Sequence, residues 1–328
     1  MAFVFPKLLH TMNALTITPQ TSLSARAYQY AAQSKSDNTI RAYKAAWREF
    51  ESFALQRGES SLPASPSLVI DYLTELADRG AKVSTIQVKL AAIASAHRTA
   101  KQPDPTHDED VKMVMGGIRR ALHVAPSKKA PVTLEELRPM INALPDSLAG
   151  KRDRAILLVG FAGAFRRSEL VDVDVSDIRL GDNKLTITVK RSKTDQEGKG
   201  LIKVVPALKD KTICPVEALR QWLDAGEIKS GAIFRQIDQW GHMRDERLTP
   251  QSVALIVKAA AIRAGLEPRQ FAGHSLRSGF ITEAAGAGVE DRDIASQTGH
   301  KSMSVLHGYI QDAGRGAMSA VRAAMGDV

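Results

Sequence analysis

Apolar residues in the first third of the chain recur at helical spacing, interrupted by short polar segments. Ser36 or Asp37 can cap the first helix, and Ser65 before Pro66 marks the start of the second. Gly80 is suited to end that second helix, and two more helices are expected before residue 123. The apolar positions that define the four faces are Ile40, Tyr43, Trp47 and Phe50; Leu68, Tyr72, Leu73 and Leu76; Ile86, Leu90 and Ile93; and Val111, Val114, Ile118 and Leu122.

These four faces predict a compact helical domain over residues 23–123. Residues 1–22 lack a clear period, which predicts a flexible tail. Residues 124–132 hold two prolines and two lysines without an apolar period, so they are expected to form a linker. The domain boundary is predicted there, and a second domain is expected over residues 133–328.

The second domain begins with helical signals and then changes period. Thr133 and Glu136 form a capping box, and residues 155–165 form an apolar stretch typical of a core helix. Apolar and polar residues then alternate in two segments, which predicts a β-hairpin or small sheet. The apolar positions are Leu185, Ile187 and Val189 in the first segment and Ile202 and Val204 in the second. Another helix is expected to start at Thr249-Pro250. The predicted fold is mainly α, with a four-helix domain and an α+β domain containing a small antiparallel sheet.

Composition narrows the class of protein. The 328 residues are 44% hydrophobic and 25% charged, which is typical of a folded globular chain. The net charge of +9 favours a polyanionic partner. A single cysteine, Cys214, excludes an intramolecular disulfide and favours a reducing cytoplasm. Neither a membrane span nor an export signal is predicted.

Two short segments of the second domain pair an arginine with a polar residue three positions away. Arg166 precedes Glu169, so the carboxylate can orient a guanidinium that could hold two phosphate oxygens. His274 precedes Arg277 at the same spacing, and both could bind one phosphate. Each pair alone is also common on ordinary protein surfaces, so neither is specific evidence of a site.

His300 and Tyr309 are two further candidate residues. In one unbroken helix their separation of nine residues would turn the two side chains about 180° apart. A break is therefore expected, with Gly299 ending one helix and Ser302 capping the next. Tyr309 could then act as a nucleophile in the same pocket as His300.

The order of these residues resembles the tyrosine recombinase (phage integrase) family of site-specific DNA recombinases. The resemblance covers about residues 23–312 and includes the segment Asn38-Thr39-Ile40-Arg41-Ala42-Tyr43 in the N-terminal domain, which is similar to the core-binding domain of the family. It implies cleavage and rejoining of double-stranded DNA through a 3′-phosphotyrosyl bond, without a cofactor or metal. A homotetramer on paired sites is also implied.

The resemblance also implies individual roles. Tyr309 is the nucleophile, Arg166 and Arg277 clamp the phosphate, His274 assists proton transfer, and His300 stabilises the transition state. Lys193 matches the hairpin lysine that protonates the leaving oxygen, with Lys190 and Lys199 as competitors nearby. Ala164 occupies a position where the family often has glycine. Outside the second domain, the expected DNA contacts are Lys82, Lys89 and Arg98, although a solvated helix face explains them as well.

Other functions remain to be separated from this one. A type IB topoisomerase shares the chemistry, but the small N-terminal unit argues against it. A regulator that binds DNA without cleaving it would have little need for the six candidate catalytic residues. A metal-dependent hydrolase using His274, His300 and His307 is a further alternative, yet no His-Glu-x-x-His motif or carboxylate cluster supports it.

Overall fold

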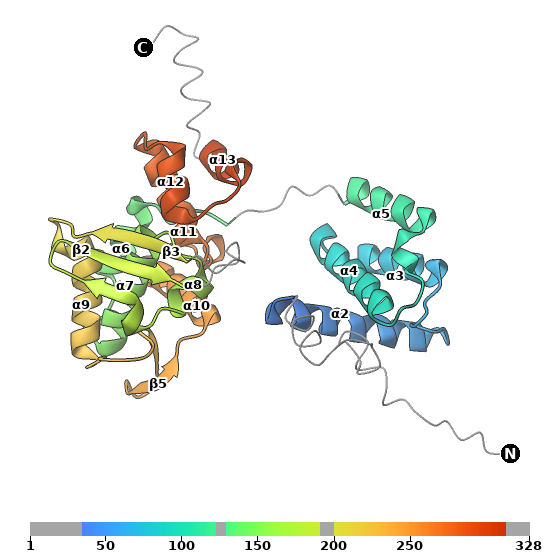
Figure 1. The fold of residues 1–328 in the computed structure, drawn as a ribbon, viewed down its shortest axis with the longest axis horizontal. Coiled ribbons are helices and arrows are strands. Elements are labelled where there is room, and N and C mark those ends of the chain that lie inside the picture. Colours follow the sequence, from blue (N-terminus) through green and yellow to red (C-terminus); the bar gives the residue numbers. More distant parts are fainter. Residues whose placement is uncertain (1–34, 123–128, 191–199, 313–328) are drawn as a thin grey trace, which may run out of the picture. The chain divides into compact units, whose positions relative to one another are not determined.

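The computed structural model describes residues 35–122, 129–190 and 200–312. The chain divides into two compact units, residues 1–127 and 128–328, and each is described here by itself (Figure 1). The predicted tail at residues 1–22 lies outside the described residues. Within the described residues, no helix is long and apolar enough to span a membrane.

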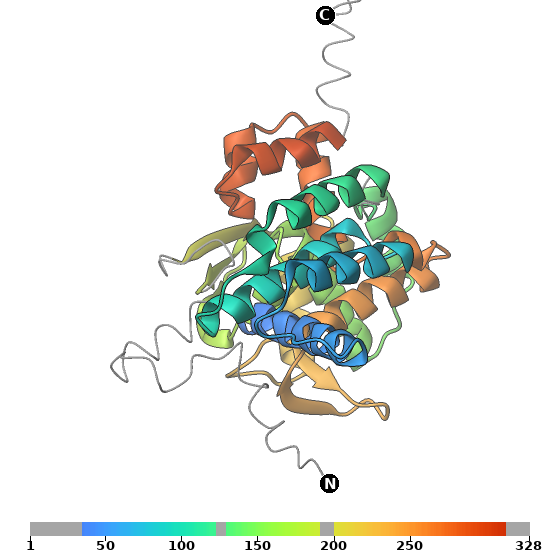
Figure 2. The same ribbon diagram turned by 90° about the vertical axis from the view of Figure 1, so that its right-hand side faces the viewer.

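In its described residues, 35–122, the first unit has four α-helices and one 3₁₀ turn. Its helices lie side by side in both views (Figures 1 and 2). They are α2 (Asp37–Gln56), α3 (Pro66–Asp78), α4 (Val83–Thr99), the 3₁₀ turn η2 (Pro105–His107) and α5 (Glu109–Ala121). Ser36 caps α2 and Ser65 caps α3, each accepting a hydrogen bond from a backbone N–H of the first turn. The third helix begins at Val83, with Lys82 as its N-cap and without a side-chain capping hydrogen bond.

The interior of the first unit is aromatic and aliphatic. Trp47, Phe50 and Tyr72 are buried, and the Phe50 and Tyr72 rings lie 5.2 Å apart in an edge-on arrangement. Burial of such rings stabilises a small domain through their large apolar area. This core contains Trp47 and Phe50 of the predicted α2 face and all four predicted positions of α3, whereas Ile40 and Tyr43 are only partly buried.

The second unit packs helices against a small sheet. Its α-helices are α6 (Leu134–Asn142), α7 (Leu148–Ala162), α8 (Arg167–Val171), α9 (Pro215–Ala225), α10 (Pro250–Arg263), α11 (Ser275–Gly286), α12 (Asp291–Thr298) and α13 (Met303–Asp312). The described part of this unit also has three short 3₁₀ turns: η3 (Val175–Asp177), η4 (Lys211–Ile213) and η5 (Pro268–Gln270). The capping box of Thr133 and Glu136 starts α6 as predicted. The mainly helical fold with small antiparallel sheets is thus confirmed.

Two antiparallel sheets occur in the described part of the second unit. The three-stranded sheet has the order β1 (Ile178–Leu180), β2 (Lys184–Val189), β3 (Leu201–Pro206), and a two-stranded sheet pairs β4 (Arg235–Ile237) with β5 (Met243–Arg247). In Figure 1 the first sheet lies across α7 and α9. The strands β1, β4 and β5 were not anticipated from the sequence.

The predicted phase of β3 is wrong. Ile202 and Val204 were expected to face the core, but they are 64% and 46% exposed. Lys203 and Val205 face the core instead, because they pair across the ladder with the buried Ile187 and Leu185 of β2. Residues directly opposite each other in an antiparallel pair share one face of the sheet. The register of the hairpin therefore places a lysine in the interior.

The apolar helix expected over residues 155–165 also ends earlier than predicted. The last residue of α7 is Ala162, and Arg166 is the N-cap of the separate helix α8. The intervening Ala164 has φ +47°, a left-handed conformation that disfavours residues with a Cβ atom. This conformation explains physically why glycine suits the position.

Candidate active site

Arg166 is oriented by Glu169 at the start of α8. The backbone N–H of Arg166 donates to Glu169 Oε2 at 3.1 Å, and its Nη1 donates to Glu169 Oε1 at 2.5 Å. Glu169 is 3% exposed, whereas the Arg166 side chain is 19% exposed. A guanidinium has five N–H donors, so the bond to Glu169 occupies only part of its capacity. The two residues are the N-cap and third residue of α8, not two positions on the face of α7.

Arg277 lies in the interior beside the Arg166 segment. It is fully buried, and its Nη1 donates to the carbonyl oxygen of Ala164 at 2.8 Å. Its Nη2 approaches His300 Nε2 at 3.2 Å. Its Nε has no hydrogen-bond partner among the described residues. Burial, followed by the charge of Arg166, lowers the pKa of Arg277 to about 10. A buried guanidinium with an open donor is costly unless it meets an anion.

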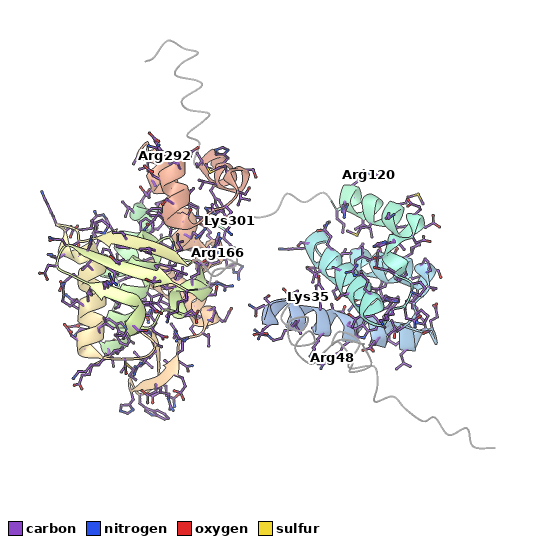
Figure 3. All side chains as sticks on the ribbon, in the orientation of Figure 1. Lys35, Arg48, Arg120, Arg166, Arg292 and Lys301 are labelled. Carbon is purple, nitrogen blue, oxygen red and sulfur yellow. The ribbon has the colours of Figure 1, made fainter. Side chains whose placement is uncertain are left out.

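The αL glycine at the end of α12 places His300. Gly299 ends α12 at φ +71°, and a Cβ atom there would lie 2.7 Å from Leu201. The expected break between His300 and Tyr309 is therefore present, and α13 begins directly after Ser302. Figure 3 shows Arg166 and Lys301, the residue after His300, on the same side of the second unit.

Hydrogen bonds define the tautomer of His300. The hydroxyl of Thr298 donates to Ile294 O at 2.7 Å, so its oxygen can accept from His300 Nδ1, which lies 2.7 Å away. Nε2 is then the acceptor that faces Arg277. Burial, then Arg277 and Arg166, lower the pKa of His300 to about 4. The imidazole is accordingly neutral at pH 7.

His274 and Tyr309 contact each other directly through their side chains. His274 is the N-cap of α11, and its Nε2 lies 2.8 Å from Tyr309 Oη. Burial, then Arg277, Arg166 and Arg167, lower the pKa of His274, although the residue keeps solvent-exposed surface. A neutral imidazole at this distance can accept the proton of a phenol.

A cavity of about 490 Å³ opens beside this contact. Tyr309 and His274 line it together with residues of α11, α13 and the segment that precedes α6. The Tyr309 ring centroid is 6.0 Å from that of His300 and 5.9 Å from that of His274. The structure thus brings five of the six candidate catalytic residues into one cluster.

The remaining candidates lie apart from this cluster or outside the described residues. Lys193 and its competitor Lys199 fall in residues 191–199, which the structure does not describe. Lys190 forms an ion pair with Asp177 at 2.6 Å. In the first unit Lys82 is exposed and precedes α4, Arg98 pairs with Asp104 at 3.2 Å, and Lys89 forms an ion pair with Glu49.

Sequence reasoning did not single out Lys203. It is fully buried on β3, and its Nζ donates to Gln297 O at 2.5 Å. Burial is the largest cause that lowers its pKa, to about 7. The alternation of Leu201, Lys203 and Val205 was the available signal, but the opposite phase of Ile202 and Val204 is equally apolar.

Among the described residues, no group of three or more His, Cys, Asp or Glu side chains could hold a metal ion. His307, the third histidine of the metal-hydrolase alternative, contacts Asp291 at 3.1 Å. That alternative gains no support from the described geometry.

Comparison with known proteins identifies the class. Residues 131–315 match the phage integrase family, and residues 27–103 match its N-terminal SAM-like domain. An integrase/recombinase XerD homolog of Selenomonas ruminantium is 39% identical over 293 residues, covering 88% of this chain and 86% of the relative. Tyrosine recombinase XerC of Myxococcus xanthus is 27% identical over 302 residues, covering 87% and 91%. The chain belongs to the phage integrase family of tyrosine recombinases, which are DNA strand-exchange enzymes.

Solved structures share the fold at lower sequence identity. XerH site-specific recombinase bound to its palindromic difH substrate has a TM-score of 0.65 at 18% identity, covering 90% of this chain and 83% of that one. A λ integrase dimer bound to a core site has a TM-score of 0.58 at 20% identity, covering 86% and 91%. These likenesses support the helical and sheet architecture described above.

Proposed function

We propose that this protein is a site-specific DNA recombinase in which Tyr309 becomes covalently joined to the 3′ phosphate of a cleaved strand. The observation that supports the proposal most directly is the 2.8 Å approach of Tyr309 Oη to His274 Nε2 in a cluster with Arg277 and His300. A nucleophile, a base and positive charge are the groups that phosphoryl transfer to a side chain requires.

The proposed step exchanges one phosphodiester bond for another. Tyr309 Oη bonds to phosphorus as the bond between phosphorus and the 5′-oxygen breaks. His274 takes the phenol proton, and the 5′-oxygen gains a proton as it leaves. A 5′-hydroxyl of another strand then reverses the step and releases Tyr309. Because the phosphotyrosyl ester conserves the free energy of the broken phosphodiester bond, the cycle requires no nucleotide cofactor.

Arg166 and Arg277 differ in how accessible they are to a DNA phosphate. Arg166 is partly exposed and held by Glu169, so it can contact a non-bridging oxygen directly. Arg277 has no solvent-accessible surface, so its contact with phosphate requires a local rearrangement of the pocket. The open Nε–H of Arg277 is the donor that such a rearrangement would offer to the phosphate. His300 is proposed to stabilise the charge that develops in the transition state through Arg277, whose guanidinium it holds with its Nε2 acceptor.

Double-stranded DNA is the proposed partner, contacted by the domains over residues 23–123 and 133–328. The net charge of +9 favours this partner, and Lys82 and Arg98 offer exposed cationic groups. Lys89 can contact DNA only if it leaves Glu49. A homotetramer on two paired sites is proposed as the assembly that exchanges strands.

A nicked suicide substrate tests the central step, because loss of a short 5′ fragment traps the covalent adduct. Wild-type protein should form an adduct that maps to Tyr309 by mass spectrometry. Tyr309→Phe should bind DNA normally and form none, since it keeps the ring and removes the nucleophile. Tyr43→Phe in the first unit is the matched control. Adduct formation by Tyr309→Phe would contradict the proposal.

Lys193 is proposed to protonate the leaving 5′-oxygen. Lys193→Ala should therefore cleave normal DNA very slowly, but should recover on a substrate with sulfur at the bridging 5′ position, because a thiolate leaves without a proton. Arg166→Ala should remain slow on that substrate. Recovery by a variant of Lys190 or Lys199 instead would assign the role to that lysine.

Strand exchange must also be separated from relaxation. Two labelled DNA duplexes carrying one target site each should yield recombinant products in the presence of the protein. Relaxation of supercoiled DNA without such products would favour the topoisomerase alternative, and binding without any adduct would favour the regulator.

A further inference from the structure

Lys203 is a charged side chain inside the core of the catalytic unit. It lies on the inward face of β3, opposite Ile187, and has no exposed surface. Lysine is seldom fully buried, because removal of an ammonium from water costs several kcal/mol. An apolar residue would fill the same position at lower cost, so the amine is expected to serve something other than packing.

The contacts of Lys203 join two of the segments that carry active-site residues. Its Nζ donates to Gln297 O at 2.5 Å, three residues before His300. The same Nζ lies 4.9 Å from the centroid of the Phe165 ring, one residue before Arg166. The Gln297 side chain strengthens this connection, because its Nε2 donates to Ala162 O at 3.0 Å and to Val204 O at 3.2 Å.

The charged groups around Lys203 come from the start of α8 and from α11. Glu169 at the start of α8 favours the ammonium, whereas Arg166 and Arg277 disfavour it. Lys203 in turn is one of the positive groups that lower the pKa of His300. With three cationic side chains near one buried carboxylate, this region has an excess of positive charge that a DNA phosphate would balance.

We propose that Lys203 is a positioning residue that holds the His300 segment against the Arg166 segment, and that it takes up a proton when a DNA phosphate enters the site. The proposal rests on the function proposed above for this pocket. The geometry supplies the first part, since one amine contacts both segments. The second part follows from electrostatics: Lys203 has a pKa of about 7 without DNA, and an added negative charge nearby raises it.

The first test separates positioning from binding and from folding. Lys203→Met keeps a long unbranched side chain but removes the donor and the charge. Lys184→Met is the matched control, because it removes a lysine from the exposed end of β2. At saturating DNA, Lys203→Met should form the Tyr309 adduct roughly 10–100-fold more slowly, as expected for displaced catalytic groups. Its affinity for DNA should fall by a smaller factor than the cleavage rate, because Lys203 does not reach the DNA and contributes to binding only through the proton that it takes up.

The second test measures protons and does not depend on cleavage. Calorimetric titration of Tyr309→Phe protein with DNA at pH 8, in buffers of different ionisation enthalpy, should show proton uptake on binding. The same titration of the Tyr309→Phe, Lys203→Arg double variant should lose that uptake, because arginine is always charged. Lys203→Arg with Tyr309 intact should cleave faster than Lys203→Met, since it retains a buried donor.

The outcomes distinguish this inference from the proposed function. If wild-type protein forms no adduct, the function fails, and the proton measurement still tests Lys203. If wild-type and Lys203→Met form the adduct at equal rates, the positioning role is overturned. Equal proton uptake with Lys203 and with arginine at this position would overturn the protonation. Should Lys203→Met fail to fold, as shown by its circular dichroism, the neutral and shorter Lys203→Gln takes its place in the rate comparison, and the arginine variant decides the protonation.

Discussion

The two units of this protein differ in the charge of the polar side chains that they bury. In the described part of the first unit, Ser95 and His97 are the buried polar side chains, and neither is an acid, a lysine or an arginine. The second unit buries Glu169, Lys203 and Arg277 within one region.

The buried side-chain atoms that lack a hydrogen bond are neutral in the described part of the first unit, where they are Trp47 Nε1 and Tyr72 Oη, and cationic in that of the second. His97 Nδ1 contacts Ile93 O at 2.8 Å, and its Nε2 accepts from the N–H of Ala64 at 2.9 Å. Both ring nitrogens are satisfied, as expected for a structural histidine. Arg277 keeps an Nε–H without a partner among the described residues, beside further positive groups. Unbalanced buried charge is therefore the physical feature that separates the catalytic region from an ordinary core.

The largest expected difference is between Arg277 and a surface arginine. Arg277→Ala should slow adduct formation at saturating DNA by ~10²–10³-fold, because one lost donor to the transition state costs this much. Arg269→Ala, at an exposed position, should leave the rate unchanged. Quenched-flow measurement of adduct formation checks both variants. An equal loss of rate in Arg269→Ala would contradict a specific role of Arg277 in stabilising the transition state.

His97 should affect stability rather than chemistry. His97→Ala removes a buried ring and leaves the N–H of Ala64 without its acceptor, so the first unit should lose about 2–3 kcal/mol of unfolding free energy. His107→Ala, at an exposed position, is the control. Urea unfolding measures the loss. The adduct rate at saturating DNA should stay within ~3-fold of wild type, and a much larger drop would mean that His97 contributes to the reaction.

Acid should weaken the second unit through His300. The pKa of His300 is about 4 in the folded protein and has an ordinary value of 6.5, so the unfolded chain binds more protons between these values. Unfolding free energy should consequently fall by about 1–2 kcal/mol as pH drops from 7 to 4.5. His300→Gln should lessen that fall. Trp47→Phe protein allows fluorescence to follow the second unit through the buried Trp222; an equal fall in both proteins would exclude His300 as the cause.

The smallest effect concerns Ala164. Glycine adopts the left-handed conformation of residue 164 without the steric cost of a Cβ atom. Ala164→Gly should therefore stabilise the second unit, by less than about 1 kcal/mol. Ala164→Val should be clearly destabilising, because a β-branched residue is poorly tolerated there. Thermal unfolding compares the two variants. A stable Ala164→Val protein would show that this backbone is not constrained.

Local signals in the sequence were sufficient for most helices and for the order of the site residues. Ser36, Ser65 and Thr133 mark helix starts through hydrogen bonds made within one turn. Gly299 marks the break that lets His300 and Tyr309 share a pocket, since the left-handed conformation there favours glycine. Such features depend on neighbours only a few residues away, which a single sequence contains.

Tertiary structure decided which charged groups are buried and what they contact. The alternation around Lys203 fits either phase of a strand, and pairing with β2 selected the one that places the amine inside. Lys89 could have faced DNA, but packing of α2 beside α4 pairs it with Glu49. The burial of Arg277 likewise depends on Ala164 and His300, which are 113 and 23 residues away in the chain. Periodicity records which residues share a face, whereas burial and pKa depend on groups brought close only by folding.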